Sequence, residues 1–294
     1  MATGRQDREQ GMTRPGQRGG EGAADTASGR HAAFYLPSGE GRFRPTPHTV
    51  GPWSPDAQHF GPPSALLVRA LERLPSDRDT LLTRVTVEIL GPAPLTELTV
   101  SATVERPGRS VELLSAELRA AGRTVARASA WRMATSDTEE AASAQPSVGA
   151  VPGPALPPVE GCAEAVWPAD WHSGYLKAME WRAVKGAILE PGPATVWARQ
   201  RVPLIEGERP SALQRLVTVA DSASGVSNQL DWNRWLFINS ELTVHIQREP
   251  DGEWIGLDAV TVLGPRGTGT AESALHDASG QVATGAQALL VRRR

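Results

Sequence analysis

Hydrophobic residues recur along this chain in two patterns, one typical of a buried helix and one typical of a half-exposed sheet. The run from Pro63 to Leu74 is apolar around most of a helical circumference, which favours a helix at the centre of a domain. Alternating apolar and polar residues follow it, as an antiparallel sheet with one solvent-facing side requires. The alternation predicts strands at 82–90, 96–105, 110–119 and 124–133.

The second half of the chain repeats this order. A second apolar helix is predicted over Pro210–Ser224, where Gly225 ends it. Two strands are predicted before this helix, near Tyr175–Arg182 and at 193–202. The strands predicted after it cover 238–247, 254–263, 268–276 and 282–291.

The repetition extends to the residues themselves. Both predicted helices begin with Pro-Ser-Ala-Leu, and the same interval separates Val85 from Val125 and Leu242 from Val282. A repeat this long is a whole domain rather than one unit of a solenoid. We therefore predict an α+β fold, a tandem (double) hotdog, in which two antiparallel sheets each wrap around a central helix and join edge to edge.

Composition divides the chain into four segments. Residues 1–33 are rich in Gly, Arg, Asp and Gln, which predicts a disordered tail. Residues 137–164 turn acidic and then rich in Pro, Ala and Gly, which predicts a linker. The N-terminal hotdog is then 34–136 and the C-terminal hotdog 165–294, since 294 residues allow two domains of about 100–130 residues that each bury a core.

Charge, cysteine content and hydropathy limit the partners and the cell compartment that the sequence favours. A net charge of −3 gives no electrostatic reason to expect nucleic acid or an anionic membrane as a partner. The single Cys162 excludes an intramolecular disulfide and suits a reducing compartment. No apolar run has the length of a membrane span, and the first residues lack the apolar segment of a secretory signal. We expect a cytoplasmic protein, and a homo-oligomer is compatible with the sequence.

Three segments of the second half resemble a known family. They are RPSALQRLVTVADSASG at 209–225, FINSELTVHIQREPDGEW at 237–254 and GQVATGAQALLVRR at 280–293. They are similar to the acyl-CoA thioesterase II (TesB-like) family, in its actinobacterial thioesterase-like branch. The resemblance implies hydrolysis of an acyl-CoA or acyl-carrier thioester by water. It implies no metal, nucleotide cofactor or covalent intermediate.

The resemblance also implies catalytic residues. In that family the second hotdog carries an Asp on the central helix, a Thr or Ser on the next strand and a Gln on the last strand, which together hold the attacking water. By position, Asp221 matches the Asp and Gln287 matches the Gln. The hydroxyl position falls at Asn239, which departs from the family, and Ser240 or Thr243 takes it only if the register slips.

The residues themselves support part of this assignment. Asp221 lies near the end of an apolar helix, where the helix dipole disfavours a carboxylate by a few tenths to ~1 kcal/mol. An acid on an element of the core is a candidate general base with a raised pKa. Gln287 lies among small residues, where its amide can orient a water or donate to an oxyanion. The plain alternatives are an exposed Asp at a helix end, an outward-facing Gln and an Asn that begins a strand.

The internal repeat serves as a control. Aligning the two copies places an apolar residue of the first copy opposite each member of the proposed triad, namely Leu74, Leu82 and Ala130. This pattern predicts one catalytic site per chain, in the C-terminal hotdog, with the N-terminal hotdog catalytically degenerate.

Substrate-binding residues are predicted on both sides of this site. His59 and Gly61 belong to the stretch where related hotdogs bring backbone N–H groups to the thioester carbonyl, and a helix N-terminus suits that role. Pro62 and Pro63 remove two of those donors, so a plain helix-entry turn is the alternative. Trp235, one of nine tryptophans, is expected to line an acyl tunnel or to fill the core.

Other chemistries find little support. The chain has no Gly-x-Ser-x-Gly motif, which disfavours an α/β-hydrolase, and its histidines lack metal-ligand spacing. Five residues after Asp221 stands Val226 rather than the histidine of a hotdog hydratase. The sequence thus predicts an acyl-CoA thioesterase of lipid metabolism with Asp-activated water. Two alternatives stay open. One is a noncatalytic acyl-thioester-binding protein, which the loss of the Thr or Ser hydroxyl at position 239 keeps open; the other is an enzyme of specialised metabolism acting on a carrier-bound acyl group.

Overall fold

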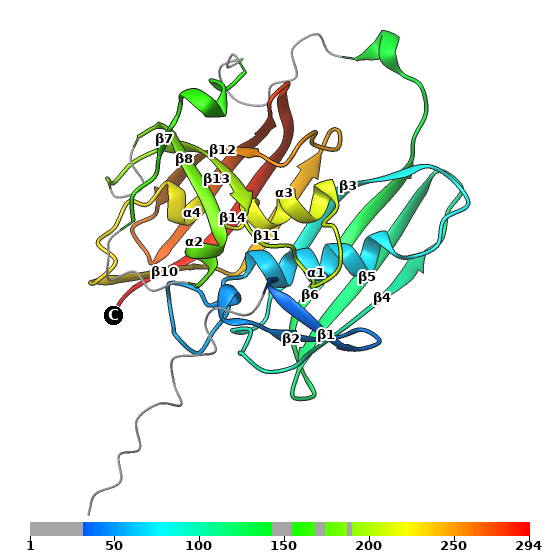
Figure 1. Ribbon diagram of the computed structural model, residues 1–294, viewed down its shortest axis with the longest axis horizontal. Coiled ribbons are helices and arrows are strands. Elements are labelled where there is room, and N and C mark those ends of the chain that lie inside the picture. The colour runs from blue at the N-terminus through cyan, green and yellow to red at the C-terminus, as the bar shows by residue number, and fades with distance from the viewer. Residues whose placement is uncertain (1–31, 143–154, 168–173, 187–189) are drawn as a thin grey trace, which may run out of the picture. The chain divides into compact units, whose positions relative to one another are not determined.

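Each half of the described chain contains one main helix followed by a run of antiparallel strands (Figure 1). The computed structural model describes residues 32–142, 155–167, 174–186 and 190–294, and Ala32–Arg294 form one compact unit. The elements of the first half are β1 (Tyr35–Gly39), β2 (Arg42–Pro45), η1 (Pro47–Thr49), α1 (Gly61–Glu72), β3 (Thr80–Ile89), β4 (Leu98–Arg106), β5 (Val111–Ala120), β6 (Arg123–Ala134) and η2 (Glu139–Ala141).

The second half begins with short elements and then repeats the helix and strands. Its elements are η3 (Val159–Gly161), β7 (Ala163–Glu164), α2 (Gly174–Ala178), β8 (Met179–Lys185), β9 (Ala194–Gln200), α3 (Ala212–Ala220), α4 (Ala223–Val226), β10 (Trp235–Asn239), β11 (Glu241–Ile246), β12 (Ile255–Leu263), β13 (Thr268–Asp277) and β14 (Gly280–Arg293). The predicted strands of both halves that follow the helices are confirmed within a few residues, except that the strand predicted at 238–247 is divided at Ser240 into β10 and β11.

The strands of both halves join in one sheet. Within the described residues its order is β1-β2-β4-β5-β6-β3-β11-β14-β13-β12-β9-β8-β7, and β10 pairs with β14 beside it. The halves meet edge to edge where β3 pairs antiparallel with β11. The predicted edge-to-edge junction is therefore confirmed.

A pseudo-two-fold axis passes through this junction. Thr86 lies opposite Ser129 in the first half, and Thr243 lies opposite Ala286 in the second half, so the repeat relates Thr86 to Thr243. These two threonines face each other across the junction, with their Oγ1 atoms 3.1 Å apart. Facing equivalent residues are the mark of a two-fold related interface.

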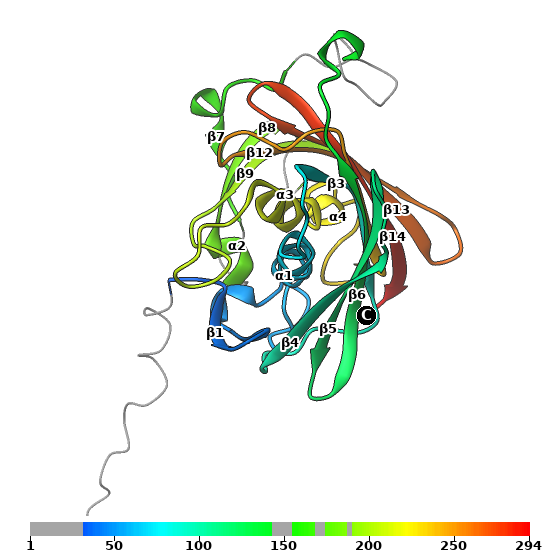
Figure 2. The ribbon, with the colours of Figure 1, turned by 90° about the vertical axis from the view of Figure 1, so that its right-hand side faces the viewer.

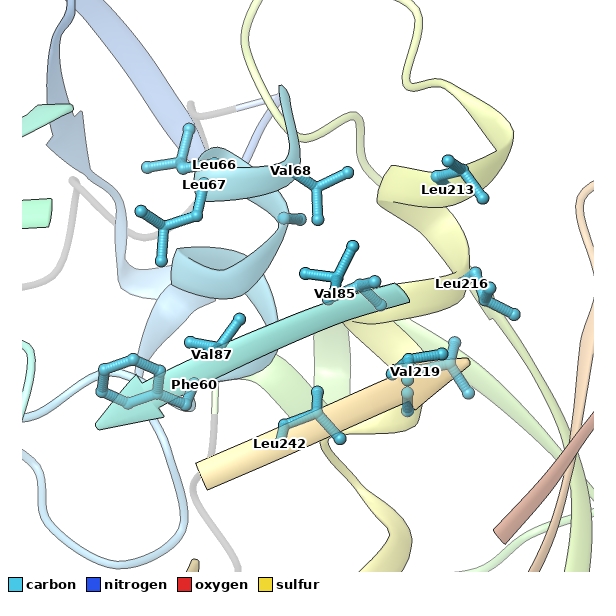
Figure 3. Packing of buried hydrophobic residues seen from close by; sticks show 14 of the residues in the cluster. Phe60, Leu66, Leu67, Val68, Val85, Val87, Leu213, Leu216, Val219 and Leu242 are labelled. Atoms are coloured by element: carbon cyan, nitrogen blue, oxygen red, sulfur yellow. The ribbon is translucent and has the colours of Figure 1, made fainter. Parts of the chain in front are cut away.

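The central helices lie on the inner side of the curved sheet and pack against each other (Figure 2). From α1, Leu66, Leu67 and Val68 are buried beside Val85 and Val87 of β3. Leu213, Leu216 and Val219 of α3 bury the matching face in the second half (Figure 3). Both helices are apolar around most of their circumference, so they are stable where the curved sheet and the neighbouring helix cover them.

Some elements differ from their prediction. The strand expected near Tyr175–Arg182 begins instead as the short helix α2 and becomes β8 only at Met179. Both β1 and β2 lie in a stretch for which alternation predicts no strand. The segment 137–164, predicted as linker, contains β7 and reaches the second half, where Trp197 Nε1 donates to the Pro157 carbonyl.

The predicted disordered tail, 1–33, lies outside the described residues except for its last two positions. Ala33 is fully buried, and its carbonyl oxygen accepts a hydrogen bond from Thr46 Oγ1 at 2.8 Å. No helix of the described residues has the length and apolar character needed to cross a membrane. The domain boundaries at 34, 136 and 165 stay a prediction.

Candidate active site

Asp221 stands where the central helix of the second half ends. Ser211 caps the start of α3, since its Oγ accepts a hydrogen bond from the Gln214 N–H, and Asp221 is the C-terminal cap. The helix predicted over 210–224 is thus interrupted at Asp221, and a short turn, α4, follows. Asp221 is 5% exposed, so the fold holds a carboxyl group in the interior beside a helix C-terminus.

The start of α1, from the other half of the chain, faces this carboxyl group. His59 Nδ1 lies 3.2 Å from Asp221 Oδ2, and the backbone N–H groups of Phe60 and Gly61 lie near enough to lower the pKa of Asp221. Gly61 allows this approach because a Cβ at that position would overlap the Thr218 carbonyl oxygen of α3. The site is therefore completed by both halves: the residues predicted to activate water lie in the second half, and His59 and Gly61, predicted to bind substrate, lie in the first.

Tyr175 fixes the imidazole of His59 in place. The two rings are parallel within 6°, with centroids 3.7 Å apart. The Tyr175 hydroxyl donates to the Thr218 carbonyl at 2.8 Å and shares a 2.9 Å hydrogen bond with Ser222 Oγ. Sequence reasoning missed Tyr175 because it assigned this residue to a strand.

Two side-chain amides approach Asp221 from the strands. Asn239, the last residue of β10, donates from Nδ2 to Asp221 Oδ1 at 2.9 Å. Gln287 of β14 donates from Nε2 to the Asp221 carbonyl oxygen at 3.1 Å and lies 3.5 Å from Oδ1, while its Oε1 accepts from the Ser224 N–H at 3.1 Å. The structure thus brings the three sequence-predicted catalytic residues together, with both amides bound to Asp221 itself.

Burial sets the protonation states in this cluster. It raises the pKa of Asp221 from 3.8 to about 7, against hydrogen bonds from Asn239, Gly61 and Phe60 that lower this pKa. It also lowers the pKa of His59 to about 3. The imidazole is therefore neutral near pH 7, and its contact with Asp221 is not an ion pair. The raised pKa expected from the sequence is confirmed, with burial rather than the helix dipole as its main cause.

A cavity of about 420 Å³ opens onto this cluster. His59, Asp221 and Asn239 contribute polar groups to its wall, and most of the remaining lining is apolar. Trp53 and Trp232, which also line it, stack with ring centroids 4.6 Å apart. A mostly apolar cavity with a few convergent polar groups is typical of a small-molecule site.

The three predicted substrate-binding residues lie in different places. His59 lines the cavity, and the Gly61 N–H donates to His59 Nδ1 at 3.1 Å. Trp235 needs a correction: among the described residues that line the cavity, β10 is represented by Leu236, Ile238 and Asn239. Strand alternation turns Trp235 away from Leu236, and its ring lies 5.4 Å from the Arg293 guanidinium carbon.

Comparisons with known proteins agree with this architecture. A family model described as the acyl-CoA thioesterase N-terminal domain matches residues 49–133, and one described as the acyl-CoA thioesterase C-terminal domain matches residues 159–291. No curated protein matches the chain.

Three solved structures share the fold at low sequence identity. A conserved hot dog protein of unknown function from Alicyclobacillus acidocaldarius is 17% identical with a TM-score of 0.69, covering 89% of this chain and 97% of its own. A putative thioesterase II from Thermobifida fusca YX is 22% identical with a TM-score of 0.66, covering 89% and 96%. The acyl-CoA thioesterase II TesB2 from Mycobacterium marinum is 15% identical with a TM-score of 0.58, covering 87% and 93%. These structures establish the tandem hotdog fold.

Proposed function

The chain belongs to the TesB-like acyl-CoA thioesterase family, and on that premise we propose that it hydrolyses an acyl-CoA with a water molecule activated by Asp221. One observation carries the proposal: a carboxyl group with a pKa of about 7 lies in the wall of a mostly apolar cavity. A general base works best when its pKa is near the working pH, because it is then both ionised and basic enough to accept a proton.

The proposed reaction needs one general base and forms no covalent bond between the protein and the acyl group. The water oxygen attacks the thioester carbonyl carbon while Asp221 accepts a proton from that water. The tetrahedral intermediate then breaks its C–S bond, and the proton held by Asp221 passes to the departing thiolate. The products are the carboxylic acid and CoA thiol, and Asp221 returns to its ionised form.

The neighbours of Asp221 have distinct roles in this scheme. The Asn239 amide orients the carboxyl group by donating to Oδ1, and the Gln287 amide holds the backbone of Asp221 by donating to its carbonyl oxygen. Neutral His59 is held by the Tyr175 ring, and its Nδ1 lies 3.2 Å from Asp221 Oδ2. The imidazole is therefore within reach of the proton that Asp221 accepts from the water. The Phe60 and Gly61 N–H groups lie at the positive end of α1, and the Gly61 N–H donates to His59 Nδ1 at 3.1 Å. They are donors for the developing oxyanion when the substrate displaces their present contacts.

Release of free thiol from a panel of acyl-CoAs by the purified protein tests the proposal. We expect thiol release that depends on Asp221 and falls in the Asp221→Asn variant. Arg109→Gln, a change in an exposed loop between β4 and β5, is the matched control and should retain full activity. Binding of acyl-CoA without thiol release would instead support the noncatalytic binder and overturn the proposal.

A further inference from the structure

Four arginines gather at one end of the second half. Arg234 precedes β10, Arg292 and Arg293 are the last two residues of β14, and Arg294 follows them; all four are exposed. Among the residues that the structure describes, none of them forms an ion pair with an acidic side chain. In a protein of net charge −3, this is a local concentration of positive charge with which no acidic side chain of the described residues pairs.

The acidic residues closest in the sequence to Arg234 are engaged elsewhere. Asp231 Oδ1 accepts a hydrogen bond from the Asn233 N–H at 2.9 Å. Glu241 Oε1 accepts from the Ala288 N–H at 2.8 Å, and its Oε2 accepts from Thr243 Oγ1. These carboxylates therefore stabilise local backbone and side-chain geometry rather than the arginines.

Two of the arginines adjoin the cavity that contains Asp221. Arg294 Nε donates to the Trp232 carbonyl at 3.0 Å, and its guanidinium carbon lies 5.8 Å from the Trp53 ring centroid. Arg292 lies opposite Leu236 across the β10–β14 pair. Trp53, Trp232 and Leu236 all line the cavity, so the arginines form a basic rim beside it.

The distance from Asp221 to this rim suits a pantetheine arm. Asn239, which donates to Asp221, lies opposite Leu289, and Arg292 lies three residues farther along β14. Three strand residues span roughly 10 Å, and the Arg292 side chain extends that reach. A thioester placed at Asp221 would therefore bring the phosphate-bearing end of its carrier close to the arginines.

From this placement we propose that Arg292 and Arg294, with Arg234 and Arg293 beside them, bind the phosphate groups of coenzyme A. Guanidinium groups pair with phosphate through two parallel hydrogen bonds, which makes arginine suited to this ligand. The tryptophan beside each of Arg293 and Arg294 restrains its guanidinium group, so less freedom is lost on binding. The proposal rests on the proposed function, because that function places the thioester at Asp221.

The double variant Arg292→Gln/Arg294→Gln tests this rim with two substrates that carry the same acyl group. For acyl-CoA, loss of charge-assisted contacts should raise KM by about 10–100-fold while kcat stays within about twofold. For the acyl-N-acetylcysteamine thioester, which has no phosphate, kcat/KM should not change. Arg109→Gln is the control, because it removes one exposed arginine far from the cavity. Arg109 lies beyond the Thr80 end of β3, whereas the cavity adjoins the Ile89 end.

Two results would overturn the proposal: an unchanged KM for acyl-CoA in the double variant, or an equal loss with the substrate that lacks phosphate. Binding of free coenzyme A, measured by titration calorimetry, separates this proposal from the proposed function because no reaction is involved. Arginine-dependent binding of coenzyme A by a protein that hydrolyses neither substrate would leave the rim in place and refute the thioesterase. Hydrolysis of both substrates, together with binding of coenzyme A that does not depend on the arginines, would refute the basic rim and leave the thioesterase in place.

Discussion

The antiparallel helices α1 and α3 meet at two places, and a carboxyl group lies at each. At one, Asp221 at the end of α3 faces the start of α1. At the other, Glu72 at the end of α1 faces the start of α3, where Ser211 Oγ and Gln214 Nε2 both donate to it at 2.7 Å. Burial is the largest influence on the pKa of both carboxyl groups and raises each. The pseudo-two-fold arrangement thus places a carboxyl group with a raised pKa at both contacts between the helices.

The surroundings of the two carboxyl groups differ. Asp221 borders the cavity and binds the amides of Asn239 and Gln287. In the first half, Leu82 and Ala130 stand at the corresponding positions; the pair Leu82–Arg132 has the same register as Asn239–Leu289. Glu72 does not belong to the described residues that line the cavity. A carboxyl group at a helix end is therefore common to both halves, whereas among the described residues the amides from the strands and the cavity adjoin Asp221.

The largest effect that this comparison predicts is the loss of the base. Asp221→Asn keeps the shape of the side chain and removes its ability to accept a proton. We expect kcat to fall by ~10²–10⁴-fold with little change in KM, because the group acts in the transition state. Steady-state thiol release measures this loss, and a fall of less than about threefold would remove Asp221 from the mechanism.

Making the second half resemble the first should have the next largest effect. Asn239→Leu and Gln287→Ala introduce the residues of the first half and remove the donors that orient Asp221. We expect each to lower kcat by roughly 10–100-fold, since misplaced catalytic groups are costly. Circular dichroism and the melting temperature are the controls for folding. If both folded variants kept full activity, the amides would not be what distinguishes the two halves.

The longer helices and strands of both halves were predictable from the sequence, because each of these elements buries an apolar face that gives a periodic pattern. The helix expected at 63–74 occurs as α1, and the strand expected at 110–119 occurs as β5, within two residues. The short strands β1 and β2 were missed, since strands of five and four residues are too short to show alternation. Tyr175 was misassigned because a five-residue helix leaves no periodic signal.

The residues of the candidate active site were predictable only in part. The repeat and the family resemblance pointed to Asp221, Asn239 and Gln287, which lie within the second half. The contact between His59 and Asp221 joins the two halves, and it depends on the β3–β11 junction and on the close approach of Gly61 to Thr218. No local pattern encodes a contact that forms only when two distant segments pack together.

Stability gives a further test of the buried Asp221. Because burial raises the pKa of Asp221 from 3.8 to about 7, the folded protein binds a proton that the unfolded chain lacks between these values. This residue's contribution to stability therefore falls as the pH rises from about 4 to about 7. Asp221→Asn should exceed the unsubstituted protein in free energy of unfolding by about 1–4 kcal/mol at about pH 8 and match it near pH 3.5. Denaturant titrations at both pH values measure the difference, and equal stability at pH 8 would contradict a raised pKa.

The smallest effect is expected at the other helix junction. Glu72→Gln keeps an oxygen that accepts from Ser211 and leaves the cavity unchanged. We expect kcat and KM for acyl-CoA to stay within about twofold of their original values, because this carboxyl group lies outside the site. A loss of activity comparable to that of Asp221→Asn, in a variant with an unchanged melting temperature, would show that both junctions take part in the reaction.

The pH dependence of kcat/KM tests the identity of the base most directly. Asp221 must be ionised to accept a proton from water, and its pKa is about 7. The rate should therefore rise about tenfold per pH unit below pH 7 and level off above it. Chromatographic detection of released coenzyme A from about pH 5 to pH 9, corrected for uncatalysed hydrolysis, gives this profile. An inflection near pH 7 that is absent from Asp221→Asn is the predicted result, and a profile that is flat over this range would contradict catalysis by the buried carboxylate.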